Sequence, residues 1–229
     1  LPISTFTTPG SIFQPVINQL SPEVHRGMAD YTEQALRSHV RNAVDAAPVS
    51  QSGKTQAFAT VHSSVAGVES SATRAGYDTA INGVTTGMRY DIDTRTRVGG
   101  MLGVDDGSIK GSLIDTEAQG VVIGAFGQYL VHESSKTTLT SSLSYGAFGY
   151  DASRHSFGGN VHADNIDSNA LELAVGVRSV VFEKNGFRVI PSAALRYLTG
   201  NVDGFVEDGS GVALDVGSQN IDSLLLDLD

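Results

Sequence analysis

The sequence predicts an all-β fold with one N-terminal α-helix, in which antiparallel strands run up and down in a transmembrane β-barrel. Residues 24–45 repeat with helical periodicity, whereas from residue 57 onward apolar and polar residues alternate. The non-apolar face of the alternating segments is rich in small, polar and charged residues, as the water-lined interior of a membrane barrel requires.

Residues 21–45 form the predicted helix. Ser21, Pro22 and Glu23 suit an N-cap and first turn, because they offer an acceptor, need no amide donor and complement the positive helix end. Apolar or small side chains then recur every three or four residues on a mainly charged helix, and Pro48 stops the pattern. This narrow stripe comprises Val24, Met28, Tyr31, Ala35, His39 and Ala43. The stripe suits a helix on a globule or one in a polar tube.

Eight strands are predicted after the helix, because period-2 alternation gives each segment one apolar face. In 171–181, for example, every second residue is apolar with one exception, and Glu172 and Arg178 fall on the other face. The strands are 57–65, 84–92, 98–104, 121–131, 139–147, 171–181, 189–197 and one beginning near Asp222. Short turns, such as 91–95 and 183–186, alternate with longer polar connections at 105–115, 151–169 and 201–217.

The alternation alone is shared by soluble sandwiches, which bury the apolar face, and membrane barrels, which expose it to lipid. Strand length and the alternation of short and long connections favour the barrel. Four tyrosines near strand ends fit an aromatic girdle, although the chain has no Trp. These are Tyr90, Tyr129, Tyr145 and Tyr197.

Composition excludes several classes of function. The chain has 229 residues with 15 Lys and Arg against 25 Asp and Glu, a net charge of −10, and no basic run, so we expect no nucleic-acid partner. The absence of Cys excludes disulfide scaffolds and thiolate metal sites. No apolar run approaches the roughly 20 residues of a transmembrane helix.

The chain resembles the translocator domain of type Va autotransporters in the order and spacing of several segments. The matching segments are 20–24, 39–45, 76–79, 83–87, 97–103 and 143–146. The resemblance implies a twelve-stranded barrel in the outer membrane of a Gram-negative bacterium, with the helix in the lumen. The barrel would lie in outer-membrane lipid as a monomer, with the barrel assembly machinery and periplasmic chaperones as partners. It would anchor and export its own N-terminal passenger.

The resemblance also implies a division of the chain. Residues 1–20 would be a passenger or linker remnant, 21–48 a helix that threads the pore, and 52–229 the barrel. Residues 222–229 begin an eighth strand and lack the closing strands of the family, so we expect a C-terminally incomplete barrel. A closed eight-stranded barrel is the alternative, but its lumen would be filled by side chains.

Charged residues on the helix and on the inner wall are the candidate functional residues, because in a barrel they would face one another and hold the helix as a plug. The set comprises Arg26, Arg37 and Arg41 on the helix and Arg89, Asp91, Arg97, Glu172, Arg178 and Arg196 on the wall. The alternative is that the wall charges only line water. The glycines of 99–103 are interpreted as making room for the helix.

No motif of catalysis is found, so we predict a non-enzymatic protein without cofactor or metal. The acidic groups at 105–106 and at Asp151, Asp164 and Asp167 match no calcium loop and are interpreted as solvated loops. The six His residues show no metal-ligand spacing, and His155 with Asp151 and Ser153 is the one local cluster of catalytic residue types. Asn42 is followed by Ala43, so the sequence lacks the paired asparagines at which some autotransporters cut themselves.

A soluble or surface-exposed β-rich adhesion or interaction module, with its sheet packed on the helix, is the alternative function. The two hypotheses differ in whether the protein needs detergent to stay folded.

Overall fold

The computed structural model describes residues 25–46, 53–70, 76–156, 158–184 and 187–228. Helix α2 (Gly27–Asp45) is followed by eight long strands that form a wall and five short strands at its two ends. The long strands are β1 (Thr55–Val68), β2 (Tyr77–Asp91), β3 (Thr96–Gly111), β4 (Ile114–His132), β5 (Thr137–Ser156), β6 (Gly159–Arg178), β9 (Ser192–Val202) and β13 (Gln219–Leu228). The short strands are β7 (Phe182–Lys184), β8 (Phe187–Val189), β10 (Phe205–Val206), β11 (Asp208–Gly209) and β12 (Asp215–Val216).

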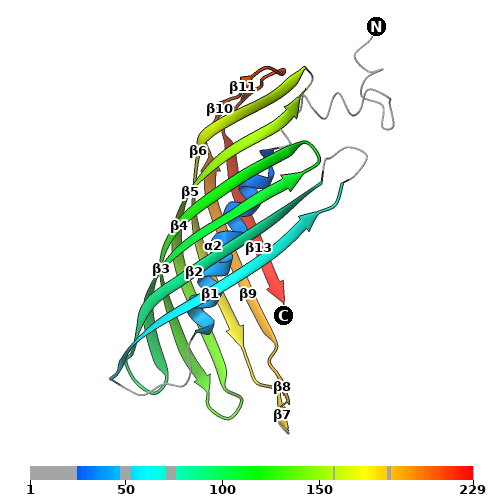
Figure 1. Ribbon diagram of the computed structural model, residues 1–229. Helices are drawn as coiled ribbons and strands as arrows, with labels where there is room; N and C mark the ends of the chain where they lie inside the picture. The colour runs from blue at the N-terminus through cyan, green and yellow to red at the C-terminus, as the bar shows by residue number, and fades with distance from the viewer. Residues whose placement is uncertain (1–24, 47–52, 71–75, 157, 185–186, 229) are drawn as a thin grey trace.

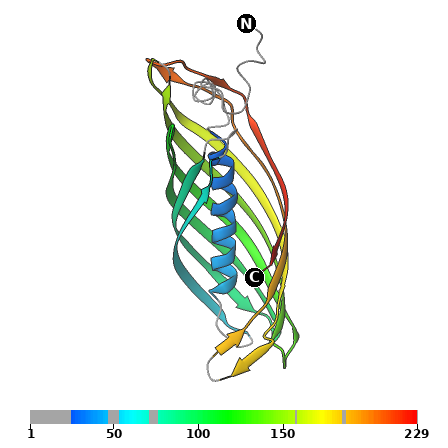
Figure 2. The ribbon, with the colours of Figure 1, turned by 90° about the vertical axis from the view of Figure 1, so that its right-hand side faces the viewer.

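Each long strand pairs antiparallel with the next, in the order β1-β2-β3-β4-β5-β6-β9-β13. The sheet curves around α2, which lies in its hollow along the length of the strands (Figures 1 and 2). Among the described residues β1 pairs only with β2 and β13 only with β9, so the sheet is not closed. The predicted all-β, up-and-down fold with an N-terminal helix inside is confirmed, and the eight predicted strands are the eight long ones.

Two connections predicted as long polar loops are strands instead. Most of 105–115 belongs to β3 and β4, which are joined at Ser112 and Leu113. Likewise 151–169 belongs largely to β5 and β6. The third predicted connection, 201–217, is largely irregular and contains the short strands β10, β11 and β12.

The prediction was wrong because the apolar residues change side along β3, β4, β5 and β6. In β4, Ile114 and Ala118 are buried while Glu117 between them is exposed. Farther along the same strand the outer face becomes apolar, since Val121 is exposed and Val122 is buried. Apolar and polar residues therefore still alternate through the acidic segments. Their polar residues face outward, however, and for this reason the segments were predicted as loops.

An exposed apolar band surrounds the part of the wall nearer the β7–β8 end. It includes Val84, Met88, Val98, Leu102, Val104, Val121, Ile123, Leu139, Leu143, Leu171, Leu173, Val175, Val177, Leu195, Leu224 and Leu226. All four predicted girdle tyrosines point outward. Tyr90 and Tyr129 lie near strand ends, whereas Tyr145 and Tyr197 lie within β5 and β9, where the outer face begins to turn polar.

The core lies between α2 and the inner face of the wall. Met28, Leu36 and Val40 of the helix are at most 3 % exposed and pack in one cluster with wall residues such as Ile81 and Phe126. Within the described part of the chain, no helix has the length and hydropathy that a membrane-spanning helix needs.

Candidate functional site: the helix seat

The helix presents the predicted stripe to the wall. Met28, Tyr31, Ala35, His39 and Ala43 are all buried, whereas Val24 lies outside the described residues. The proposed cap at residues 21–23 also lies outside them. The described helix begins at Gly27, after Arg26, whose side chain makes no capping hydrogen bond, and it ends at Asp45.

Glycines on β3 let the helix lie close to the wall. A Cβ at Gly103 would overlap the His39 ring, and a Cβ at Gly107 would lie 2.7 Å from the Tyr31 ring. The prediction that the 99–103 glycines make room for the helix is thus confirmed for Gly103. Gly99 instead leaves space for the ring of Phe126, a wall residue.

One buried carboxylate on β3 binds two side chains of the helix. The Tyr31 hydroxyl donates to Asp105 Oδ1 at 2.7 Å, and His39 Nε2 lies 3.1 Å from Asp105 Oδ2. His39 Nδ1 lies 2.8 Å from the Thr85 hydroxyl of β2, so both ring nitrogens have a wall partner. We call Asp105, Thr85, Tyr31 and His39 the helix seat; all four are at most 7 % exposed.

The interpretation of Asp105 as a member of a solvated acidic loop was wrong. Asp105 lies in strand β3 with the same inward orientation as Gly103 and Gly107, and burial of an unpaired carboxylate would be costly without its two partners. The sequence does place Asp105 on the same face of the strand as Gly103 and Gly107. Its acidic neighbour Asp106, on the outer face, made the pair look like part of a solvated loop.

A second group of neutral hydrogen bonds fixes the first turns of α2. The Tyr150 hydroxyl of β5 donates to the carbonyl of Met28 at 3.0 Å and lies 2.6 Å from the Thr32 hydroxyl. Ser168 of β6 lies 3.1 Å from the same threonine. These residues are not predicted from the sequence, because isolated hydroxyls in a strand give no signal of what they face.

The predicted charged residues divide into those that contact the helix and those that do not. Arg178 Nη1 lies 3.0 Å from Asp45 Oδ1, and Arg89 Nη1 donates at 3.0 Å to the carbonyl of Ala46 at the helix end. Arg37 pairs at 2.8 Å with Asp227 of β13, a wall residue that the sequence analysis did not select.

The remaining charges pair within one element or within the wall. Arg97 pairs with Asp91 at 2.5 Å, and Arg196 bridges Glu172 at 3.1 Å and Asp227 at 2.6 Å. On the helix, Arg41 lies 3.8 Å from Asp45 of the same helix, and Arg26 is exposed. A cavity of about 380 Å³ lies beside Arg37, Arg41 and Arg178, so part of this set also borders open space.

Typical interaction free energies indicate that the helix seat holds α2 more strongly than the exposed ion pairs do. Half-exposed ion pairs such as Arg178 with Asp45 contribute about 0–1 kcal/mol, because water screens them. Buried hydrogen bonds to a charged group contribute roughly 1.5–3 kcal/mol each. Asp105 accepts two such bonds from the helix, so the seat stabilises the position of α2 more than the exposed charges do.

The three residues of the local cluster of catalytic residue types, His155, Ser153 and Asp151, each hydrogen-bond to a different partner outside the cluster. His155 Nδ1 lies 2.6 Å from Asn160 Oδ1, and Ser153 donates to the carbonyl of Asp115 at 3.3 Å. Asp151 accepts a bond from the backbone amide of Asn165. Among the residues that the structure describes, no group of three or more His, Asp or Glu could hold a metal ion.

Comparison with known proteins agrees with this geometry. A family model described as the autotransporter beta-domain matches residues 57–229, well over half of the chain. The fold is similar to that of the translocator domain of autotransporter NalP from Neisseria meningitidis, with a TM-score of 0.71 and 16 % sequence identity over 91 % of this chain and 70 % of that chain. No curated protein sequence matches the chain.

Proposed function

This chain belongs to the autotransporter β-domain family, and we propose that α2 is the linker to its passenger and is held in the lumen as a plug by the helix seat. The resemblance inferred from the sequence is thus confirmed. The chain is an outer-membrane translocator of type V secretion in a Gram-negative bacterium, with a passenger attached. No finding favours the soluble adhesion module, and the exposed apolar band argues against it.

The observation that supports the plug is that Asp105 hydrogen-bonds to both Tyr31 and His39 of the helix. These two helix residues are eight positions apart, about 12 Å along the axis, so one carboxylate fixes both the rotation and the height of α2. A helix that merely rested in a water-filled tube would not bury an acid against itself. We extend the proposal to residues 21–48 as the pore-threading linker, 1–20 as a passenger or linker remnant and 52–229 as the barrel.

The proposal also includes a non-enzymatic mode of action. Export then needs a path and an anchor but no bond-breaking residue in the wall. Two buried acids of the inner face support this, because Asp105 and Glu172 are each used in contacts with other side chains of the protein. Assembly by the barrel assembly machinery and periplasmic chaperones, and a monomeric state, complete the proposal.

Substitution of the seat tests the plug. We expect Asp105→Asn to weaken the hold on α2 by about 1–3 kcal/mol and to raise the conductance of the full chain in planar lipid bilayers. The matched control is Asp106→Asn on the outer face of the same strand, which should leave conductance unchanged. Arg178→Gln should have a small effect, because that pair is half exposed. A folded Asp105→Asn protein with unchanged conductance would contradict the plug.

A further inference from the structure

A segment outside the helix seat lies at the end of the lumen at which α2 begins. Residues 203–218, which we call the strap, connect β9 to β13 and contain β10, β11 and β12. Within the strap, β10 pairs with β12, and β11 pairs with β6 through Asp208 opposite His162 and Gly209 opposite Val161. The strap therefore folds back on itself and lies along the wall instead of projecting from it (Figure 1).

Backbone contacts hold the strap close to β6. The Ser210 amide donates to the carbonyl of Asn160 at 3.1 Å, and the Asp203 amide donates to that of Asp167 at 2.8 Å. Gly209 has a φ of +143°, and a Cβ there would overlap the Asn160 carbonyl. The close approach at this position requires glycine for both reasons.

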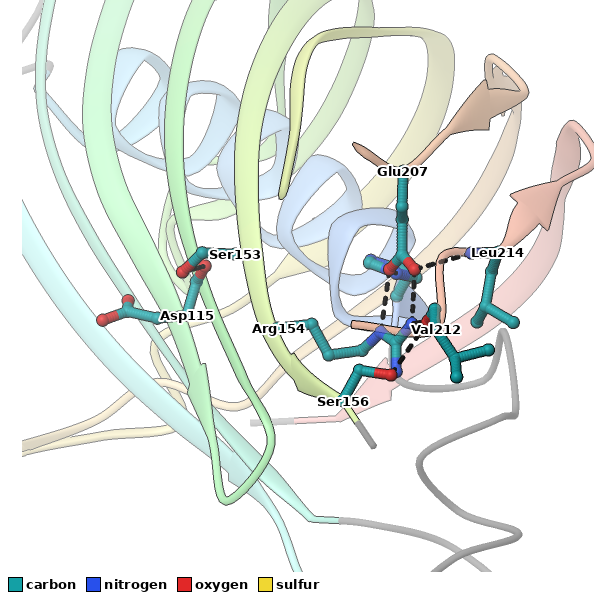
Figure 3. Close-up of polar contacts among 8 residues, drawn as sticks. Asp115, Ser153, Arg154, Ser156, Glu207, Val212 and Leu214 are labelled. Carbon is teal, nitrogen blue, oxygen red and sulfur yellow. Dashed lines mark hydrogen bonds and ion pairs between the residues drawn. The ribbon is translucent and has the colours of Figure 1, made fainter. Parts of the chain in front are cut away.

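A buried acid joins the strap to the wall. Glu207 Oε1 accepts a hydrogen bond from Arg154 Nε of β5 at 2.8 Å, and Arg154 Nη2 pairs with the other oxygen. The backbone amide of Leu214 donates to Glu207 Oε2 at 2.9 Å, and Arg154 also donates to the carbonyl of Val212 (Figure 3). The strap thus surrounds the guanidinium from two sides.

The same acid joins the strap to the helix. His25 Nε2, two residues before α2, lies 3.0 Å from Glu207 Oε1. The His25 ring also packs edge-on against Phe205 of β10, with 4.8 Å between ring centroids. The side chains of His25, Arg154 and Glu207 are each only 1 % exposed, so helix, wall and strap share one desolvated contact.

The contact requires His25 to lie opposite the strap. While a chain moves through the lumen, the residue opposite Glu207 and Phe205 changes with each step. In the structure His25 lies at the strap and is the partner of both the acid and the ring, while Tyr31 and His39 lie at the seat. Building on the proposed function of α2, we propose that the strap is a latch that closes on His25 when α2 has reached its seat.

Hydrogen–deuterium exchange of the full chain in detergent micelles tests the latch. Glu207→Gln should speed exchange about tenfold both in the strap and at residues 31–36, whose amides have intrahelical partners. His25→Gln should loosen only the helix, because Arg154 still ties the strap to the wall. The matched control is Asp208→Asn, since Asp208 is exposed and bonds the amide of Gly209 within the strap. It should change neither segment.

The outcomes separate the latch from the plug. If both variants leave helix exchange at its original rate, the strap is a surface loop and the latch is overturned, while the plug stands. If the helix exchanges rapidly in the unmodified chain, the plug itself fails and the latch fails with it. Heat-modifiable gel migration checks folding, and should Glu207→Gln not fold, the helix response to His25→Gln decides the matter.

Discussion

At the scale of single residues, two buried carboxylates matter more than the many exposed ones. Asp105 fixes α2 to β3, and Glu207 joins the strap to the wall and to His25. Both lie in segments whose sequence is polar, so composition alone does not distinguish them from their solvated neighbours. The distinction depends on which side of the backbone each side chain occupies.

The buried contacts of Glu207 should make the stability of the protein depend on pH. Burial alone would raise its pKa, but hydrogen bonds from Arg154, His25 and the Leu214 amide together lower the pKa to about 2, from 4.5. A carboxyl whose pKa is lower in the folded state stabilises the fold fully above pH 4.5, and this contribution is lost as the pH falls from 4.5 toward 2.

Thermal unfolding measured between pH 6 and 2.5 checks this prediction. The native chain should lose stability in the acid part of the range by more than Glu207→Gln, whose strap contact no longer titrates. Equal pH profiles for the two proteins would show that Glu207 does not contribute in this way. The comparison isolates this residue because both proteins share every other acid.

At the scale of elements, the fit between α2 and the wall depends on small residues opposite large ones. The rings of His39 and Tyr31 occupy the space that side chains at Gly103 and Gly107 would fill. Close packing leaves no slack at such positions, so added volume must displace a ring and its hydrogen bonds.

Gly103→Ala tests this fit. The added methyl group would overlap the His39 ring and disturb its bonds to Thr85 and Asp105, and we expect a loss of about 1–3 kcal/mol. The measurement is urea unfolding of the full chain in detergent. Gly149→Ala on β5 is the control, because nothing lies within 4 Å of a Cβ built there. An equal effect of the two substitutions would argue against a tight seat.

At the scale of the whole molecule, the outer surface divides into an apolar band and an acidic extension. On β6, Val175 is exposed within the band, whereas Asp167 is exposed beyond it on the same face of the strand. In an outer-membrane protein the apolar part lies in lipid, and the acidic part projects from it into water.

Arginine placed at these two positions should therefore differ in cost. Val175→Arg near the centre of the band should destabilise the protein in lipid vesicles by about 2–4 kcal/mol, and Asp167→Arg by about 0–1 kcal/mol. Denaturant unfolding in vesicles measures both. If the two variants lost equal stability, the assignment of the membrane boundary on β6 would be wrong.

The sequence by itself determined the class of the fold, the order of its elements and the direction of their faces. Period-2 alternation specifies which residues share a face, and the helical stripe specifies which residues of α2 are buried, because both depend only on backbone geometry. The predicted eight strands and the buried Met28, Tyr31 and His39 follow from this. Arg89 and Arg178, two of the charged residues predicted to face the helix, were placed on the inner wall by the same parity.

Only the tertiary structure decided how far the strands extend and which inner side chains meet. The alternation of β3–β6 reverses its polarity where the outer surface leaves the apolar band, and a pattern read as apolar against polar cannot locate that change beforehand. Contacts such as Asp105 with His39 join residues 66 positions apart, and Glu207 with His25 joins residues 182 apart. Which residues meet in such contacts depends on the strand register and on the height of the helix. Both are set by the assembled sheet and cannot be read from a local segment of sequence.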